Sequence, residues 1–167
     1  DTRVPIWAIF EEATLGEFGN FYSCLSYGVR REVSIKLGFH QPSDSDAFLT
    51  KKIIFAIKEL RNAVAHNDVI FDTRFSRSSI DKSLSSSLEI VTGIKSITFK
   101  SITDYIILVV YLLKCFGVPK GDMRRFVAEF QDNIETLRKQ IPTSLFARIV
   151  LTDTRPKLKS LQEYIRK

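Results

Sequence analysis

The chain has 167 residues, 44% hydrophobic and 26% charged, which is ordinary for a globular domain and excludes a disordered or collagen-like chain. This length predicts one compact domain with its own core, either alone or as the later part of a longer protein. The net charge of +6 is concentrated near the C-terminus, where residues 120–167 hold 11 basic and 6 acidic side chains. That excess suits a polyanionic partner, although by itself it fits a solvated helical surface slightly better.

Helical periodicity dominates the chain and no convincing alternation of period two occurs, so we expect an all-α bundle. Glycine, proline and short polar residues separate the expected helices. Their ranges are 5–14, 15–37, 47–66, 78–90, 98–116, 119–140, 144–150 and 157–166.

The N-terminal half carries capping signals. Thr14 is expected to cap the second helix, and the stretch Ser43-Asp44-Ser45-Asp46 the third, because short oxygen side chains accept from the free amides of a first turn. A metal site at the two aspartates is less favoured, because no histidine, cysteine or further acid lies nearby in the sequence. Buried stripes are predicted at Phe18, Phe21, Tyr22, Leu25 and Val29, and at Phe48, Ile53, Ile57, Leu60 and Val64.

The C-terminal half is expected to hold the core helix. The apolar run Tyr105–Leu113 is nine residues long, about half of the ~20 that a membrane span needs, so helix 98–116 is predicted to be buried in protein. The serine-rich helix 78–90 is expected at the surface, and residues 143–167 are expected to form a basic extension.

The cysteines and the N-terminus bear on the compartment. Cys24 and Cys115 match no metal or redox spacing, and we expect buried thiols in a reducing cytoplasm rather than a disulfide. No signal-peptide leader is recognised, so a cytoplasmic protein without a membrane contact is predicted. No cofactor and no metal are expected.

The end of the third helix is the candidate site. Lys58, Asn62 and His66 follow one another at i, i+4 and i+8 and are expected to share one polar stripe, with Arg61 beside it. These groups suit RNA cleavage without metal, because an imidazole can act as base or acid and a guanidinium can hold the phosphate. His40 is expected to be simply exposed in a connector. One chain then has too few acid–base groups, which predicts a symmetric dimer that supplies a second copy.

Three segments resemble a known family. Glu59-Leu60-Arg61-Asn62-Ala63-Val64-Ala65-His66-Asn67 resembles the Arg-Asn-x-x-x-His signature of the HEPN superfamily. The segment Val69–Phe75 and the opening Val4–Gly16, similar to a Pro-x-Trp…Glu-x-x-Thr-x-Gly block, narrow the resemblance to the Abi-like (abortive infection, AbiD/AbiF-type) family. The resemblance covers roughly residues 3–77.

The resemblance implies an HEPN-like bundle with additional C-terminal helices, spanning residues 1–167 as a single domain. It implies a metal-independent endoribonuclease that dimerises around the motif, serves in phage defence or as the toxin of a toxin–antitoxin pair, and can be linked to a small non-coding RNA. By that match Arg61 and His66 are the catalytic residues with Asn62 beside them, while Glu11 and Thr14 support the motif helix. Basic residues expected to contact RNA are Lys58, Arg74, Arg124 and Arg125.

Two other interpretations stay open. In the first, the chain is a non-catalytic module that holds a structured small RNA, and Arg61 and His66 act as RNA contacts or at a dimer interface. In the second, it is a purely structural helical dimer, and Asn62 and His66 only cap the helix end. An arginine and a histidine five positions apart occur often by chance, so the wider resemblance carries most of the functional prediction.

Overall fold

The computed structural model describes residues 6–71, 73 and 80–167. In these residues the chain forms nine α-helices and no strand, which confirms the all-α prediction. The helices are α1 (Ile6–Glu12), α2 (Leu15–Cys24), α3 (Tyr27–Lys36), α4 (Leu49–Ala65), α5 (Lys82–Thr92), α6 (Ile102–Cys115), α7 (Lys120–Gln140), α8 (Thr143–Ile149) and α9 (Thr154–Arg166).

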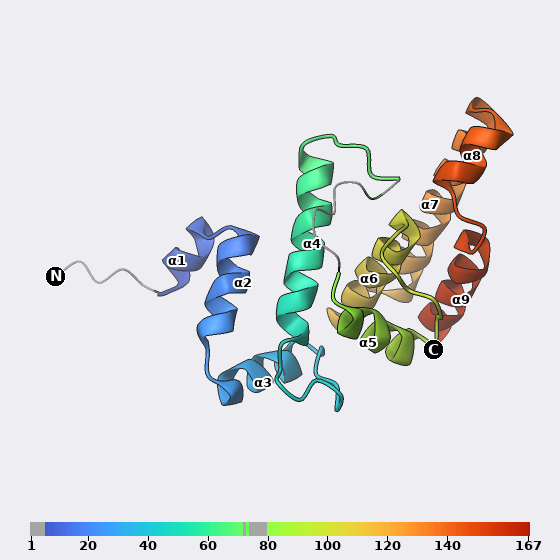
Figure 1. Ribbon diagram of the computed structural model, residues 1–167. Helices are drawn as coiled ribbons and strands as arrows, with labels where there is room; N and C mark the ends of the chain where they lie inside the picture. The colour runs from blue at the N-terminus through green and yellow to red at the C-terminus, as the bar shows by residue number, and fades with distance from the viewer. Residues whose placement is uncertain (1–5, 72, 74–79) are drawn as a thin grey trace.

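Helix α4 stands in the middle of the molecule (Figure 1). On one side it packs against α2, which is joined to α1 and α3, and on the other side against α5 and α6. Helix α6 in turn contacts α7 and α9, and α8 packs on α7. One face of α4 therefore belongs to the core, and the opposite face packs against α2.

The core is built around α6, as its apolar run predicts. Nine of its residues are buried, including Tyr105, Ile107 and Leu108. In the described part of the chain, no helix combines the length and the apolar character needed to cross a bilayer.

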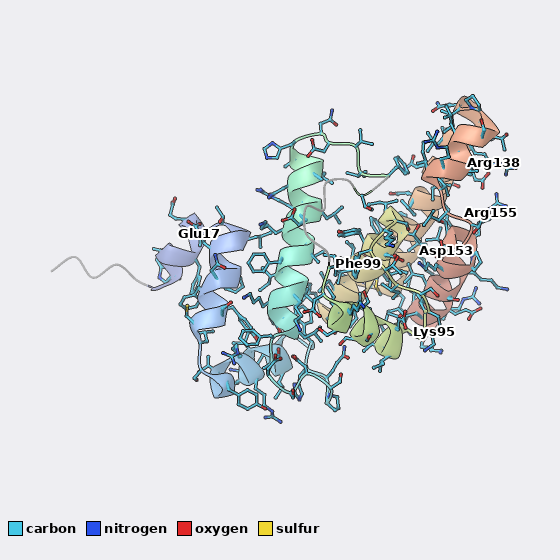
Figure 2. All side chains as sticks on the ribbon, viewed as in Figure 1. Glu17, Lys95, Phe99, Arg138, Asp153 and Arg155 are labelled. Atoms are coloured by element: carbon cyan, nitrogen blue, oxygen red, sulfur yellow. The ribbon has the colours of Figure 1, made fainter. Side chains whose placement is uncertain are left out.

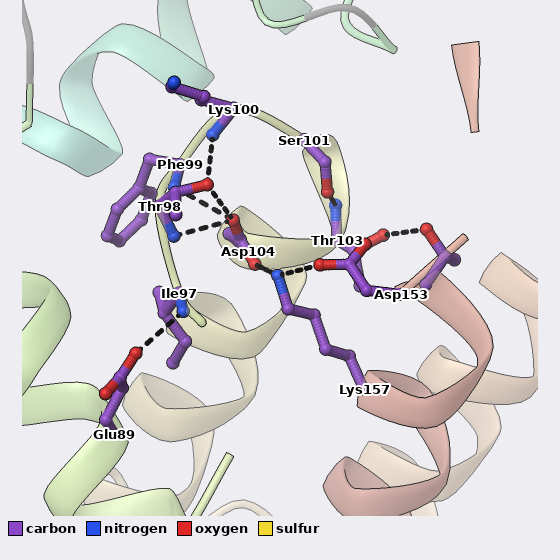
Figure 3. Close-up of polar contacts among 11 residues, drawn as sticks. Glu89, Ile97, Thr98, Phe99, Lys100, Ser101, Thr103, Asp104, Asp153 and Lys157 are labelled. Atoms are coloured by element: carbon purple, nitrogen blue, oxygen red, sulfur yellow. Dashed lines mark hydrogen bonds and ion pairs between the residues drawn. The ribbon is translucent and has the colours of Figure 1, made fainter. Parts of the chain in front are cut away.

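A buried ion pair joins α6 to α9. The Lys157 ammonium lies 2.7 Å from the Asp104 carboxylate, and the two side chains are only 4% and 0% exposed (Figure 3). Lys157 also pairs with Asp153 at 2.8 Å. The helix expected as a basic tail is thus an amphipathic core helix, whose buried residues include Leu158 and Leu161.

The predicted helix 15–37 is wrong, because Leu25 and Ser26 are extended and separate α2 from α3. Arg30 holds the break, because its guanidinium donates both to the Leu25 carbonyl and to the carbonyl of the distant Asp46. Helix α3 then leaves the direction of α2, which is why the predicted stripe does not stay buried. Phe21 and Val29 are exposed, and of the stripe only Tyr22 is fully buried.

Two further boundaries differ from the prediction. Helix α6 begins at Ile102 rather than residue 98, because the Asp104 carboxylate accepts the backbone N–H groups of Thr98 and Phe99 and holds them in a loop. Helix α5 is not a purely surface helix, since Leu84 and Leu88 on one face are buried in the core.

Candidate functional site

The site is carried by α4, whose start follows the predicted capping. Asp44 accepts from the N–H groups of Phe48 and Leu49, and Asp46 accepts from Phe48. The helix begins at Leu49 rather than Ala47, because Ala47 has a positive φ of 56°. The capping role of the two aspartates is confirmed.

Close packing places α2 against α4. Gly19 is buried on α2, and a Cβ there would lie 2.7 Å from a ring carbon of Phe55 and 3.3 Å from Ile54. A glycine is therefore required at this crossing for α2 to approach α4 so closely.

The approach brings the start of α2 beside the motif. Thr14 caps α2 in a capping box, accepting from the Glu17 N–H at 3.2 Å while Glu17 accepts from the Thr14 N–H at 2.8 Å. Hydrogen bonds to the Glu17 carboxylate from the Thr14 backbone N–H and from the Thr14 side chain hold the pKa of Glu17 below its ordinary value. Figure 2 shows Glu17 near the start of α2. The turn Ala13–Gly16 is fixed by this box and faces α4.

A pocket of about 440 Å³ lies between this turn and α4. Its lining combines the turn Ala13–Gly16 with Lys58, Arg61 and Asn62. Two of the segments that carry the family resemblance, Val4–Gly16 and Glu59–Asn67, are 43 positions apart in the chain, and both line this one pocket. Thr14 lines it directly, whereas Glu11 is exposed and is not among the lining residues.

The polar groups of the pocket are partly paired with each other. Arg61 donates to the Asn62 side-chain oxygen at 3.1 Å, and Lys58 pairs with Glu59 at 3.2 Å. Arg61 is exposed, and Lys58 keeps 28% of its side chain exposed. Two cations therefore remain accessible to an anion, while Asn62 orients one of them.

His66 lies outside this pocket, at the end of α4. It is the C-cap residue, and the helix closes in a Schellman motif: Asp68 N–H donates to the Ala63 carbonyl and Asn67 N–H to the Val64 carbonyl. Asn67 takes the left-handed conformation with φ 56°, as its position after the helix predicts. Five residues along a helix turn by about 140°, so Arg61 and His66 point in different directions within one chain.

The end of α4 extends beyond the core, and this corrects one prediction. Val64 was expected on the buried face, but it is 60% exposed, as Val69 is at 63%. The helical period assigns Val64 correctly to the apolar side, but the described helices packed on α4 leave its last turn uncovered. His66 is also exposed, and in the sequence it lies between these two valines.

The other candidates do not join this site. His40 is half-buried rather than exposed, and its N–H donates to Ser34, whose hydroxyl contacts Thr50 in the first turn of α4. His40 and His66 thus lie near opposite ends of a 17-residue helix about 25 Å long.

The predicted RNA contacts on α7 also lie apart from the motif. Arg124 and Arg125 are exposed on α7, which packs on α6, α8 and α9, and Arg125 pairs with Asp122 at 2.8 Å. Figure 2 likewise shows Arg138 and Arg155 on the side of the molecule away from α2. Arg74 lies outside the described residues.

No group of three or more histidine, cysteine, aspartate or glutamate side chains in the described residues could hold a metal ion. Cys24 and Cys115 are free thiols there; Cys24 is exposed rather than buried, and burial raises the pKa of Cys115.

Comparison with known proteins gives one finding. A family model described as Abi-like protein matches residues 1–72, the part of the chain that holds both the turn Ala13–Gly16 and the motif on α4. The searches of curated proteins and of solved structures gave no match. The match over residues 1–72 supports an Abi-like assignment, which suggests a role in abortive infection, a form of phage defence.

Proposed function

We propose that this chain is a metal-independent endoribonuclease of the HEPN type that acts in abortive infection or as the toxin of a toxin–antitoxin pair. Its active site is composed at a homodimer interface, with Arg61, Asn62 and His66 as the functional residues. The observation that carries the proposal is the pocket in which Arg61, Asn62 and Lys58 meet the turn Ala13–Gly16.

The pocket suits a phosphodiester. The Arg61 guanidinium, oriented by Asn62, offers a planar fork that matches two phosphate oxygens, and Lys58 adds a second positive charge. Such cations stabilise the charge that develops on the phosphorus oxygens during substitution.

The proposed reaction is an internal transfer. The RNA 2′-oxygen attacks the adjacent phosphorus and gives its proton to a base, while the bond from phosphorus to the 5′-oxygen breaks and that oxygen takes a proton from an acid. The products are a 2′,3′-cyclic phosphate and a 5′-hydroxyl. One imidazole, His66, serves as base or acid, and His66 of a second copy serves as the other.

The exposed end of α4 supports a second copy. Val64 and Val69 flank His66, and full burial of a valine side chain contributes about 1.5–3 kcal/mol. A two-fold axis passing near His66 would bury both valines twice and bring the two imidazoles together.

A second candidate function follows from one observation. Within a single chain the pocket is lined by two cations and no histidine. Such an arrangement can bind a phosphate, but it lacks an acid or base that would help to cleave the phosphodiester bond. The non-catalytic alternative, a module that holds a structured small RNA, predicts salt-sensitive RNA binding without cleavage.

Cleavage in the presence of EDTA tests the proposal. The protein should cut RNA and leave 2′,3′-cyclic phosphate ends, and Arg61→Ala and His66→Ala should each lower the rate by about 100-fold or more. Arg148→Ala, at an exposed position on α8, is the matched control and should cut like the parent. If Arg61→Ala and His66→Ala stay folded and cut as fast as the parent, the proposed active site is wrong.

Dimerisation has its own test. Val64→Asp should lower the dimer fraction in sedimentation and reduce cleavage in the same proportion, because it places a charge in the proposed interface. Leu145→Asp changes an exposed apolar residue on α8 and is the control. Full activity of a monomeric Val64→Asp protein would refute the composite site.

A further inference from the structure

The outer face of α1 and α2 is aromatic and acidic. Trp7 on α1 is 59% exposed, and Phe10 and Phe21 are 41% and 44% exposed. Trp7 and Phe10 are three positions apart on one face of α1, and the ring centre of Phe10 lies 5.5 Å from that of Phe21, so these side chains form one aromatic patch. Together they expose about 300 Å², a size at which an apolar patch often serves a binding role. Residues 6–29 carry three acidic side chains and no basic one.

A pocket of about 550 Å³ lies on the opposite side of α4, among α7, α8 and α9 (Figure 1). Its lining includes the buried Ile134 and Leu158 and the partly exposed Phe146, Val150 and Leu151. This volume is within the range of small-ligand sites, and an indole ring is smaller than the ligands that such sites hold. The pocket can therefore accept a large aromatic side chain from outside.

The charge around this pocket is opposite to that of α1 and α2. Residues 138–155, which include α8 and the linker to α9, carry four basic side chains and one acidic side chain. Arg155 lines the pocket, keeps 71% of its side chain exposed and pairs with Glu135 at 2.7 Å. Glu135 is also paired with Arg138, so its charge is compensated and the rim of the pocket remains positive. Figure 2 shows Arg138 and Arg155 on the side of α4 opposite to Glu17.

We propose that Trp7 of one copy of the chain inserts into this pocket of a second copy, so that the copies join head to tail. The insertion removes the indole ring from water and brings the exposed Glu11 and Glu12 of α1 near the basic rim. Because the two contacting surfaces differ, each pair keeps one free aromatic patch and one free pocket. Further copies can then add at both ends and form a ring or a filament.

A second copy accounts for both surfaces at once. A small molecule would fill the pocket but leave Trp7 and Phe10 in water, and a nucleic acid would meet an apolar lining there. The contact is weak, because a patch of about 300 Å² is well below the ~800 Å² that each partner buries in a standard interface. Assembly should therefore depend on protein concentration, with a dissociation constant in the micromolar range. The contact involves no residue of the proposed active site, so it is independent of the proposed function.

Fluorescence and sedimentation test the contact, because Trp7 is the only tryptophan of the chain. Both measurements use the full chain with Val64→Asp, which removes the proposed two-fold contact. Raising the concentration from about 1 to about 100 μM should increase the sedimenting mass and shift the Trp7 emission to shorter wavelength. Trp7→Lys and Leu151→Asp should each weaken self-association about 30-fold or more, as expected for an aromatic anchor and its pocket. The matched controls Val29→Lys and Leu145→Asp change exposed apolar residues outside the patch and the pocket, and should associate like the parent.

Mixing the two variants gives the decisive measurement, because each keeps the surface that the other lacks. The Trp7→Lys protein retains the pocket and contains no tryptophan, whereas the Leu151→Asp protein retains Trp7. The mixture should form a one-to-one pair that does not grow further. The emission of the Leu151→Asp protein should shift to shorter wavelength as the Trp7→Lys protein is added.

An unchanged emission of the folded Leu151→Asp protein on addition of the folded Trp7→Lys protein overturns the proposal. Self-association of the Leu151→Asp protein at the strength of the parent also overturns it, because the aromatic patches would then pair with each other. A parent that keeps a constant mass and emission up to about 100 μM does the same. RNA cleavage by the parent decides the proposed function separately, so either one can fail without the other.

Discussion

Replacing Lys157 by methionine tests the buried ion pair between α6 and α9. The Asp104 carboxylate accepts from Lys157 at 2.7 Å and from the N–H groups of Thr98 and Phe99 at 3.0 and 2.9 Å (Figure 3). Phe99 has a positive φ of 57°, so this loop depends on those hydrogen bonds. The pair thus fixes both the docking of α9 and the entry of the chain into α6.

The size of the loss follows from what the substitution leaves behind. Removing one partner of a buried ion pair costs about 3–5 kcal/mol, because the other charge stays buried without compensation. Methionine keeps most of the apolar stem of Lys157, and two backbone N–H groups still stabilise Asp104. We therefore expect a loss near the lower end, about 3 kcal/mol, which is a large part of the ~5–15 kcal/mol of a typical domain.

Urea denaturation measures this loss as a lower midpoint at unchanged slope. Lys159→Met, two positions along α9 and exposed, is the matched control and should change stability by less than about 0.5 kcal/mol. Adding Asp104→Asn to Lys157→Met should restore part of the stability, because a neutral amide oxygen still accepts the loop N–H groups. A loss below about 1 kcal/mol in Lys157→Met would refute the reasoning.

The same pair predicts an alkaline limit to stability. Burial by itself lowers the pKa of Lys157, but the hydrogen bonds and charges of Asp104 and Asp153 outweigh it and raise that pKa above 10.5. A raised pKa in the folded state means stabilisation that is complete below the ordinary lysine pKa and is lost as pH rises through the folded value. The free energy of unfolding of the parent should fall above about pH 10.5, and Lys157→Met should lack this part of the fall.

Other substitutions test the α2–α4 crossing. Gly19→Ala should lower stability by about 1 kcal/mol and weaken RNA binding, because the added methyl group pushes on Phe55. The control Gly28→Ala meets open space and should change neither stability nor binding, so equal melting temperatures of the two variants would contradict this prediction. Thr14→Ala should cost about 1 kcal/mol in urea titration and reduce cleavage, since the turn at the pocket loses its cap; parent-like values in both assays would argue against it. Tyr22→Phe should lower the free energy of unfolding by about 1–2 kcal/mol, because the buried hydroxyl donates to the carbonyl groups of Arg30 and Ala47. A calorimetric loss below half of that value would show that these hydrogen bonds do not stabilise the fold.

Local chemistry explains the parts of this fold that could be predicted from the sequence. Thr14, Asp44 and Asp46 cap helices, and Asn67 ends one, because each acts on backbone groups within a few positions of itself. The apolar run of α6 is also visible locally. Because nearly every face of that helix is apolar, the run alone predicts that the helix is buried in the core.

Long-range contacts explain the parts that could not. Arg30, which holds the break at Leu25, also donates to the Asp46 carbonyl 16 positions away, and Asp104, which sets the start of α6, has its partner Lys157 53 positions away. The sequence places Lys157 in a basic extension, because its charge is visible there and its partner Asp104 is not. The apolar spacing of α9, with Leu158 and Leu161 buried, is the signal that could have corrected this.

The candidate site combines both kinds of information. The sequence identifies Arg61, Asn62 and Lys58 as neighbours on one helix, but the turn Ala13–Gly16 completes their pocket only because Gly19 lets α2 approach α4. The helical turn between Arg61 and His66 separates them by about 140°, which a single chain cannot correct without unwinding α4. Any reaction that needs both groups on one phosphate therefore needs a second chain or a rearranged helix end. The Schellman closure and the exposed Val64 make the first route the less costly one, because it keeps every helical hydrogen bond and buries apolar surface.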